Sequence, residues 1–140
     1  MKCQPNPNAF AIPVRVYYED TDAGGVVYYA NYLKFFERCR TEWMRLAGYD
    51  QSQLATESGI AFVARKASCE YLKPARLDDA LMIGLEVEKL TRVRVVFRQY
   101  VRRGDDELVT GSVEIACVNR LTLTPVAIPD YLYSKLEALK

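Results

Sequence analysis

The stretch from Asp20 to Gly25 brings together residue types that can carry out acyl chemistry. It reads Asp-Thr-Asp-Ala-Gly-Gly, and a predicted helix begins just after it, near Tyr28 to Asn31. A carboxylate held in such a loop can act as a nucleophile or activate water. The free N–H groups at a helix start can stabilise an oxyanion on an acyl carbonyl. The segment therefore combines a candidate nucleophile or base, Asp22, with a candidate oxyanion site.

The same residues also have a purely structural interpretation, which local chemistry alone favours. Aspartate and threonine ahead of two glycines form ordinary strand-to-helix turns, because their side chains bond nearby backbone groups and cap helices. Glycine at positions 24 and 25 also permits backbone conformations and close approaches that other residues avoid. Within this segment alone, both interpretations stay open.

An absence narrows the possible chemistry, since the chain of 140 residues contains no histidine. That excludes a Ser-His-Asp triad, a Cys-His pair and a histidine-ligated metal within the chain. Proton chemistry must then come from Asp, Glu, Tyr, Cys, Lys or backbone groups. Cys39 and Cys69 are possible nucleophiles, but without histidine nothing obvious would lower their pKa, so we expect buried thiols.

A strand and a long helix are the elements expected to position this segment. Apolar and polar residues alternate from Ile12 to Tyr18, which predicts a strand with one apolar face. Residues 30–47 change to a helical period with a wide apolar arc, which predicts a helix buried on most of its circumference. Gly48 is well placed to end that helix.

The second half of the chain is predicted to be mostly strand. We expect strands over residues 59–71, 81–88, 93–101 and 109–117, a short helix over Gln51–Glu57 and a terminal helix over Pro129–Leu139. Short connections between consecutive strands require antiparallel pairing. One apolar helix and one sheet with an apolar face cover each other if the sheet curls round the helix. The expected fold class is α+β, with a curved antiparallel sheet wrapped around one long central helix.

Composition indicates a single domain over residues 1–140, with residues 1–9 as a flexible lead-in that lacks the apolar core of a secretory signal. The formal net charge of +1 gives no electrostatic reason to expect nucleic acid or an anionic membrane as a partner. No stretch has the length of a membrane span. The four cysteines lack metal-type spacing. We interpret them as reduced thiols of a cytoplasmic protein, although spacing leaves a disulfide open.

A longer pattern surrounds Asp22. The string YYEDTDAGGVVYYANYLKFFERCR covers residues 17–40, and Phe62-Val63 and YLKPARLDD, residues 71–79, follow downstream. This pattern resembles the signature of the 4-hydroxybenzoyl-CoA thioesterase family, within the hotdog superfamily, and is especially similar to its Tol-Pal-associated acyl-CoA thioesterase branch. It covers nearly the whole chain after residue 12. The matching residues of the string are Tyr18, Asp20, Thr21, Asp22, Gly25, Val26, Val27, Tyr28, Asn31, Tyr32, Phe36, Glu37 and Arg40.

The resemblance implies a hotdog fold and hydrolysis of acyl-CoA to a free acid and coenzyme A, with no metal and no other cofactor. It puts the family's catalytic carboxylate on Asp22, as nucleophile or general base, and its oxyanion donor on the backbone N–H of Tyr29. It also implies a homodimer or homotetramer whose sites combine residues of two chains. The substrate-binding residues that it implies are Gly25, Val27, Tyr28, Phe62, Val63, Arg65, Arg92 and Arg94.

The arginines in this set are chosen because coenzyme A carries phosphates, which guanidinium groups bind well. The tight turn over residues 91–94 resembles the family's phosphate-contacting turn, and Arg65 with Lys66 is a second possibility. For any one of them, solvated surface charge is the competing interpretation.

One position departs from the pattern, because the Tol-Pal-associated branch usually has histidine where this chain has Tyr29. The backbone N–H survives the change, whereas a phenol, with an ordinary pKa of about 10, does not replace an imidazole as a base. Two other functions stay open. One is a hotdog dehydratase or hydratase, which typically relies on a histidine. The other is a non-catalytic module that binds acyl-CoA, an acyl-carrier protein or an envelope-associated partner.

Overall fold

The computed structural model describes residues 10–48, 52 and 54–140. The lead-in expected at residues 1–9 lies outside them. The strands are β1 (Phe10–Arg15), β2 (Ile60–Tyr71), β3 (Ala80–Leu90), β4 (Arg94–Arg103) and β5 (Asp106–Asn119). The helices are α1 (Asn31–Leu46) and α3 (Asp130–Leu139), and short helical turns occur at Tyr18–Asp20 and Leu54–Ser58. The predicted helix over Gln51–Glu57 lies partly outside the described residues, and a single π-helical turn forms its described part.

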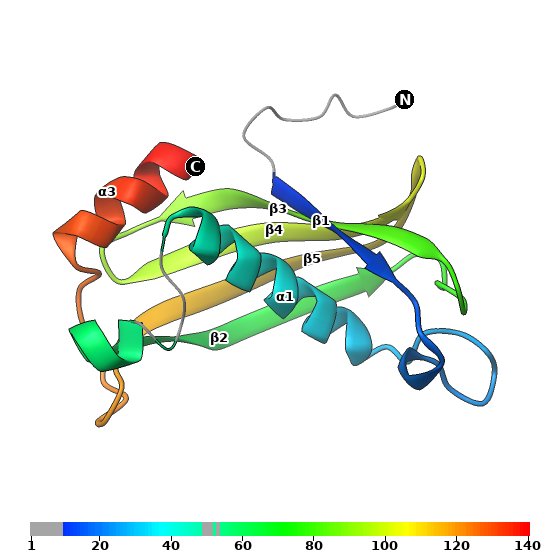
Figure 1. Ribbon diagram of the computed structural model, residues 1–140, viewed down its shortest axis with the longest axis horizontal. Coiled ribbons are helices and arrows are strands. Elements are labelled where there is room, and N and C mark those ends of the chain that lie inside the picture. Colours follow the sequence, from blue (N-terminus) through cyan, green and yellow to red (C-terminus); the bar gives the residue numbers. More distant parts are fainter. Residues whose placement is uncertain (1–9, 49–51, 53) are drawn as a thin grey trace.

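The five strands form one antiparallel sheet in the order β1-β3-β4-β5-β2. Helix α1 lies along one face of this curved sheet, with β1 and β2 at its two edges (Figure 1). The α+β class and the curved sheet around a long helix are thus confirmed. The short connections pair β3 with β4 and β4 with β5, whereas β1 pairs with β3 and β2 with β5 although they are distant in sequence.

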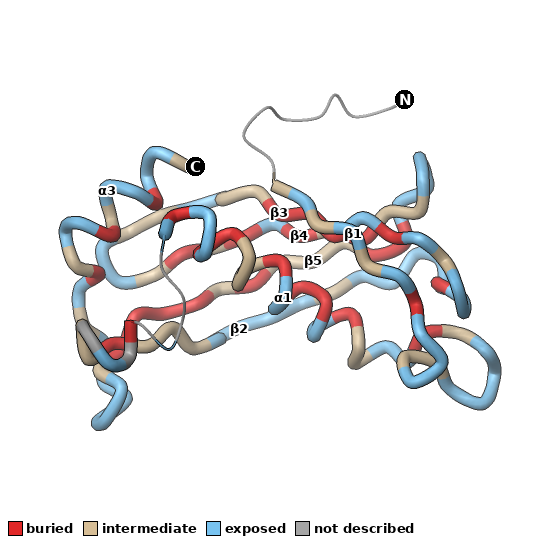
Figure 2. Tube along the Cα trace, viewed as in Figure 1, coloured by how far each residue is buried: buried red, intermediate tan, exposed pale blue. Residues whose placement is uncertain are grey.

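The core lies between α1 and the sheet, where buried segments of both face each other (Figure 2). Trp43 of α1 meets Phe97 of β4 edge-on, with ring centroids 5.4 Å apart. The prediction that α1 is buried on most of its circumference is wrong for the single chain. Leu33 and Leu46 are 41% and 60% exposed, because the sheet covers only one side of the helix.

The first strand ends at Arg15, earlier than the predicted Tyr18, which is 82% exposed. The Asp20 carboxylate accepts a hydrogen bond from the Tyr17 N–H at 2.9 Å, and the Thr21 N–H donates to the Tyr18 carbonyl at 3.1 Å. A short polar side chain that binds the local backbone in this way competes with strand pairing. The chain therefore turns out of the sheet just before Asp22.

The two edge strands differ in length and exposure. β1 has 6 residues and β2 has 12, and β2 is exposed on both faces from Ala64 to Ser68. At the end of the sheet where β3 turns into β4, α3 packs through the buried side chains of Leu132 and Leu136. The long open edge of β2 and the two ends of the sheet determine where the candidate site residues lie.

Candidate active site

Asp22 lies in a tight loop between the first strand and α1. The Asp22 N–H donates to the Val26 carbonyl at 2.9 Å, and the Gly25 N–H donates back to the Asp22 carbonyl at 3.0 Å. Gly25 has a φ of 78°, in the left-handed region that glycine adopts without steric penalty. The loop is thus a closed turn with Asp22 at its first corner.

The Asp22 carboxylate is oriented by the same loop. Its Oδ1 atom accepts a hydrogen bond from the Gly24 N–H at 2.8 Å, and the residue is exposed. Within the described part of the chain, its Oδ2 atom makes no hydrogen bond. One oxygen therefore holds the group in place while the other remains available to a substrate or a water molecule.

The segment Ala75–Asp79 anchors the loop to the rest of the fold. The Val27 N–H donates to the Ala75 carbonyl at 2.8 Å, and Val26 forms an antiparallel bridge with Arg76. On the side of the helix, the Asn31 side-chain amide donates to the Asp20 carbonyl at 2.9 Å. Both arms of the loop are thus fixed.

The start of α1 leaves the expected oxyanion donor free. The Asn31 N–H donates to the Tyr28 carbonyl at 2.9 Å, and the Tyr32 N–H donates to the Tyr29 carbonyl at 3.3 Å. The Tyr29 N–H itself has no acceptor among the residues that the structure describes. A free N–H at the positive end of a helix favours a developing negative charge.

Tyrosines line a cavity of about 230 Å³ beside this helix start. Tyr29, Tyr32 and Tyr71 form its aromatic wall, with Tyr71 ring centroids 6.2 Å from Tyr29 and 5.7 Å from Tyr32. Val27 and Leu72 add aliphatic surface. Burial raises the pKa of Tyr71 and of Tyr32, so both rings stay neutral phenols near pH 7. This cavity fits the apolar part of an acyl group.

The sequence pattern assigned no individual role to Tyr71 or Leu72, which line this cavity. Tyr28, a predicted substrate contact, is exposed, and its ring lies 4.7 Å from that of Tyr29. Its hydrogen bond with Tyr29 raises the pKa of the Tyr28 phenol. Of the predicted residues, Asp22, Gly25, Val27, Tyr28 and Tyr29 therefore lie together.

A second group of predicted residues lies at the other end of the sheet. Phe62 pairs with Cys117, whose N–H donates to the Val93 carbonyl at 2.8 Å, so Phe62-Val63 and the turn that carries Arg92 are neighbours. β3 runs for 11 residues between the Asp22 end and this turn. At about 3.3 Å per residue, the two groups are roughly 35 Å apart. One chain does not bring them together.

Two of the predicted arginines, Arg92 and Arg94, already have partners. Arg92 Nη1 donates to Asp130 Oδ1 at 2.7 Å, and its guanidinium lies 4.1 Å from the centre of the Tyr133 ring. Arg94 lies 3.5 Å from Glu114. Arg65 is exposed at an irregularity in the pairing of β2 with β5. A phosphate at Arg92 would therefore have to compete with the carboxylate of Asp130.

The described cysteines do not supply a nucleophile. Burial raises the pKa of Cys39 to about 12 and of Cys117 to about 11, and it also raises the pKa of Cys69. All three are free thiols. The expectation of buried, inert thiols is confirmed for Cys39 and holds chemically for Cys69, which is half-buried.

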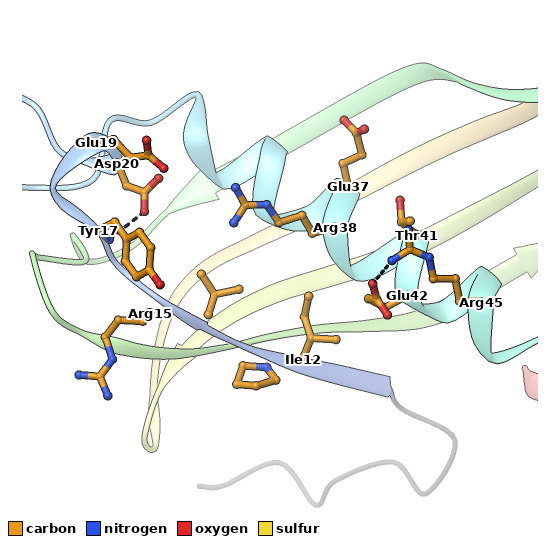
Figure 3. Close-up of a pocket in the computed structure, with 12 residues that line it drawn as sticks. Ile12, Arg15, Tyr17, Glu19, Asp20, Glu37, Arg38, Thr41, Glu42 and Arg45 are labelled. Atoms are coloured by element: carbon orange, nitrogen blue, oxygen red, sulfur yellow. Dashed lines mark hydrogen bonds and ion pairs between the residues drawn. The ribbon is translucent and has the colours of Figure 1, made fainter. Parts of the chain in front are cut away.

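A more spacious cavity, about 520 Å³, lies elsewhere, between β1 and the exposed face of α1 (Figure 3). Charged side chains of both signs surround it, including Arg38, Glu42 and Arg45. Arg45 is paired with Glu42. None of the predicted site residues lines it. We interpret it as a solvated groove between charged side chains.

The described part of the chain contains neither a cluster of metal ligands nor a helix that could span a membrane. No cluster of Cys, Asp and Glu side chains there has the arrangement of a metal site. None of the helices in the same residues combines the length and the apolar character that crossing a bilayer requires.

Comparisons with known proteins assign this chain to a family. The family model described as the thioesterase superfamily matches residues 24–110. The acyl-CoA thioesterase YbgC of Haemophilus influenzae is 44% identical over 133 residues, which cover 95% of this chain and 98% of that protein. The acyl-CoA thioester hydrolase YbgC of Escherichia coli is 43% identical over 133 residues, which cover 94% and 98%.

Among solved structures, a probable thioesterase from Bartonella henselae superposes with a TM-score of 0.81 at 38% identity, covering 86% of this chain and 99% of that one. The chain therefore belongs to the thioesterase superfamily and has the hotdog fold.

Proposed function

We propose that the protein hydrolyses acyl-CoA thioesters to a carboxylic acid and coenzyme A, with Asp22 as its catalytic carboxylate. The supporting observation is local. A loop bonded to both sides orients one oxygen of Asp22, and the Tyr29 N–H at the adjacent helix start has no acceptor among the described residues. The relatives named as acyl-CoA thioesterases match over nearly their whole length.

The geometry suits two routes for Asp22. As a nucleophile, its carboxylate adds to the thioester carbonyl, the Tyr29 N–H stabilises the oxyanion, and the C–S bond breaks to release the coenzyme A thiolate. Water then cleaves the resulting mixed anhydride. As a general base, Asp22 takes a proton from water, whose oxygen adds to the same carbonyl, and the departing sulfur receives a proton. Neither route requires an imidazole.

We further propose that the working site is shared between two copies of the chain. Pairing two β2 edges antiparallel about their middle sets Ile60 of one copy opposite Tyr71 of the other. The Phe62 end of one copy then meets the Asp22 end of its partner, which joins the two groups of site residues. This arrangement explains why residues of one pattern lie roughly 35 Å apart within a single chain.

The function is tested by replacing Asp22. The Asp22→Asn variant keeps the size and the hydrogen-bond acceptor of the side chain but loses its charge. We expect thiol release from a panel of short-chain, long-chain and aromatic acyl-CoAs to fall at least about 100-fold. Asp78→Asn is a matched control, because Asp78 is exposed and has a φ of 70°, which asparagine tolerates.

Two results would contradict the proposal. If the Asp22→Asn variant hydrolyses the panel at the wild-type rate, Asp22 is not the catalytic carboxylate. If the wild-type protein binds acyl-CoA and releases no thiol, the protein is a non-catalytic binding module. We place its action in the cytoplasm, because the described cysteines are free thiols, as is usual in a reducing compartment.

A further inference from the structure

Gln99 of β4 occupies an unusual position for an amide. It is fully buried beneath α1, between the apolar residues Phe97 and Val101 of the same strand face. Among the described residues, it is the one polar side chain in the buried class. Burial of an amide is unfavourable unless its donors and acceptors are bonded. Its partners therefore indicate why an amide is there.

Both ends of the Gln99 amide are engaged by α1. Its Nε2 donates to the Phe36 carbonyl at 3.1 Å, and its Oε1 accepts from Arg40 Nη1 at 2.8 Å. The first bond orients the amide, and the second fixes the guanidinium. Gln99 thus holds Arg40 at a defined place between the helix and the sheet.

Arg40 keeps unused donors at that place. A guanidinium has five N–H groups, and among the described residues this one makes a single hydrogen bond, to Gln99. Arg40 lines a cavity of about 240 Å³, which also contains Glu37. None of the described buried side-chain N and O atoms lacks a partner, so the unused N–H groups of Arg40 are accessible rather than buried, and this cavity is open space that Arg40 lines.

The cavity lining has a defined chemistry. Its apolar part includes Met44, Phe62 and Ile115, Thr41 adds a hydroxyl, and Arg40 and Glu37 supply one charge of each sign. Arg40 only donates hydrogen bonds and the Glu37 carboxylate only accepts them. A hydroxyl group does both, while Glu37 repels a carboxylate and Arg40 repels an amine.

We propose that this cavity receives the far end of the acyl group and that Arg40 and Glu37 select acyl groups that carry a hydroxyl there. The inference rests on the proposed function, because Phe62 joins this cavity to the site that a second copy's Asp22 would complete. A cavity that combines apolar walls with a guanidinium donor and a carboxylate acceptor can bond a single hydroxyl through both its oxygen and its hydrogen. A pocket built to bond a hydroxyl discriminates strongly against the analogue that lacks it.

The test compares matched substrates that differ only by that group. Dissociation constants are measured by calorimetry, on the Asp22→Asn protein, for ω-hydroxyhexanoyl-CoA against hexanoyl-CoA and for ω-hydroxyoctanoyl-CoA against octanoyl-CoA. Thiol release from the same compounds is measured in parallel on the wild-type protein. In at least one pair, we expect the hydroxylated compound to bind about tenfold more tightly.

Two substitutions of Arg40 test whether this side chain causes the preference for the hydroxylated compound. In Arg40→Met the affinity ratio should fall to about one, and in Arg40→Lys it should be intermediate, since lysine keeps the charge and lacks the planar fork. Arg38→Met is the matched control, because Arg38 lies on the opposite, exposed side of α1 and lines the other cavity (Figure 3). It should leave the ratio unchanged.

The outcomes separate the two proposals. Equal affinities within both pairs, or no binding of either member, would overturn the hydroxyl inference even if thiol is released. A tenfold ratio that survives in Arg40→Met and Arg40→Lys would also overturn it. A tenfold ratio without thiol release would support this cavity's role and contradict the hydrolase function.

Discussion

The hydroxyl oxygen of Tyr32 accepts a hydrogen bond from the Ala75 N–H at 3.1 Å. Tyr32 belongs to the first turn of α1, and the Ala75 carbonyl in turn accepts a hydrogen bond from the Val27 N–H at 2.8 Å. A continuous chain of contacts therefore connects the helix, the segment after β2 and the arm of the Asp22 loop. The helix start and the Asp22 loop are thus both held to the same segment after β2.

Removing the Tyr32 hydroxyl tests this connection. The Tyr32→Phe variant leaves the buried Ala75 N–H without its acceptor, which should lower the free energy of unfolding by about 1–3 kcal/mol. Small displacements of catalytic groups have large effects on rate, so we expect kcat to fall about tenfold or more while KM changes little. Urea unfolding and steady-state thiol release measure the two effects.

The control for that variant is Tyr133→Phe on α3. The Tyr133 ring contacts Arg92, and its hydroxyl makes no hydrogen bond within the described residues. This variant should change neither stability nor kcat appreciably. If Tyr32→Phe and Tyr133→Phe behave alike, Tyr32 does not position the loop.

Gly25→Ala should impair catalysis through backbone strain. A side chain at a φ of 78° is disfavoured by about 1 kcal/mol, and the open space around Gly25 means that no direct clash adds to it. We expect a small loss of stability and a larger loss of kcat/KM, because the turn orients Asp22. Gly104→Ala, at a φ of 61° in the β4–β5 turn, should lose similar stability and keep full activity.

Mixed dimers test whether the site is shared. Asp22→Asn and Phe62→Ala proteins should each have low activity alone. A purified heterodimer of the two would contain one site with both residues intact, so about half of the wild-type activity should return. A heterodimer that is no more active than the better of its parents would show that Asp22 and Phe62 act within one chain.

The buried cysteines should be unreactive in the native protein. With pKa values of about 12 for Cys39 and about 11 for Cys117, almost no thiolate is present at pH 8. Peptide mapping after treatment with iodoacetamide should find both residues unmodified until the protein is unfolded in urea. Rapid modification of Cys39 in the folded state would contradict the burial that the structure shows.

Asp79 should contribute a stabilisation that depends on pH. Burial acts to raise its pKa, but the Arg76 N–H and the Arg103 guanidinium, 2.7 Å away, outweigh it and lower the pKa below the ordinary 3.8. Because the folded pKa is depressed, this stabilisation is present above pH 4 and is lost as the pH falls through the folded value.

The Asp79→Asn variant measures that contribution. It should be less stable than the wild type at pH 7 by about 1 kcal/mol, the upper range for a partly exposed ion pair. The difference should shrink as the pH falls below the ordinary pKa of 3.8. Urea unfolding at pH 7 and pH 3 gives both values, and a difference that does not change with pH would exclude Asp79 as its source.

Local pattern was a reliable guide wherever neighbours along the chain determine the structure. The helical period of residues 31–46, the alternation in β3 and β4 and the glycine turn after Asp22 all depend on residues within a few positions of each other. The early end of β1 was missed because the Tyr17 backbone N–H donates a hydrogen bond to the Asp20 carboxylate, and this local bond competes with strand pairing. The absence of histidine was evident from composition alone.

Contacts between distant segments were decided only by the tertiary structure. Arg40 meets Gln99 across 59 positions and Tyr32 meets Ala75 across 43, and nothing local marks either pair. In the alternation of β4, Gln99 simply occupies an apolar position. The separation of Arg92 from Asp22 likewise follows from the length of β3. Hydrophobic period determines which face of an element is buried, whereas packing of the whole sheet against α1 determines which side chains meet.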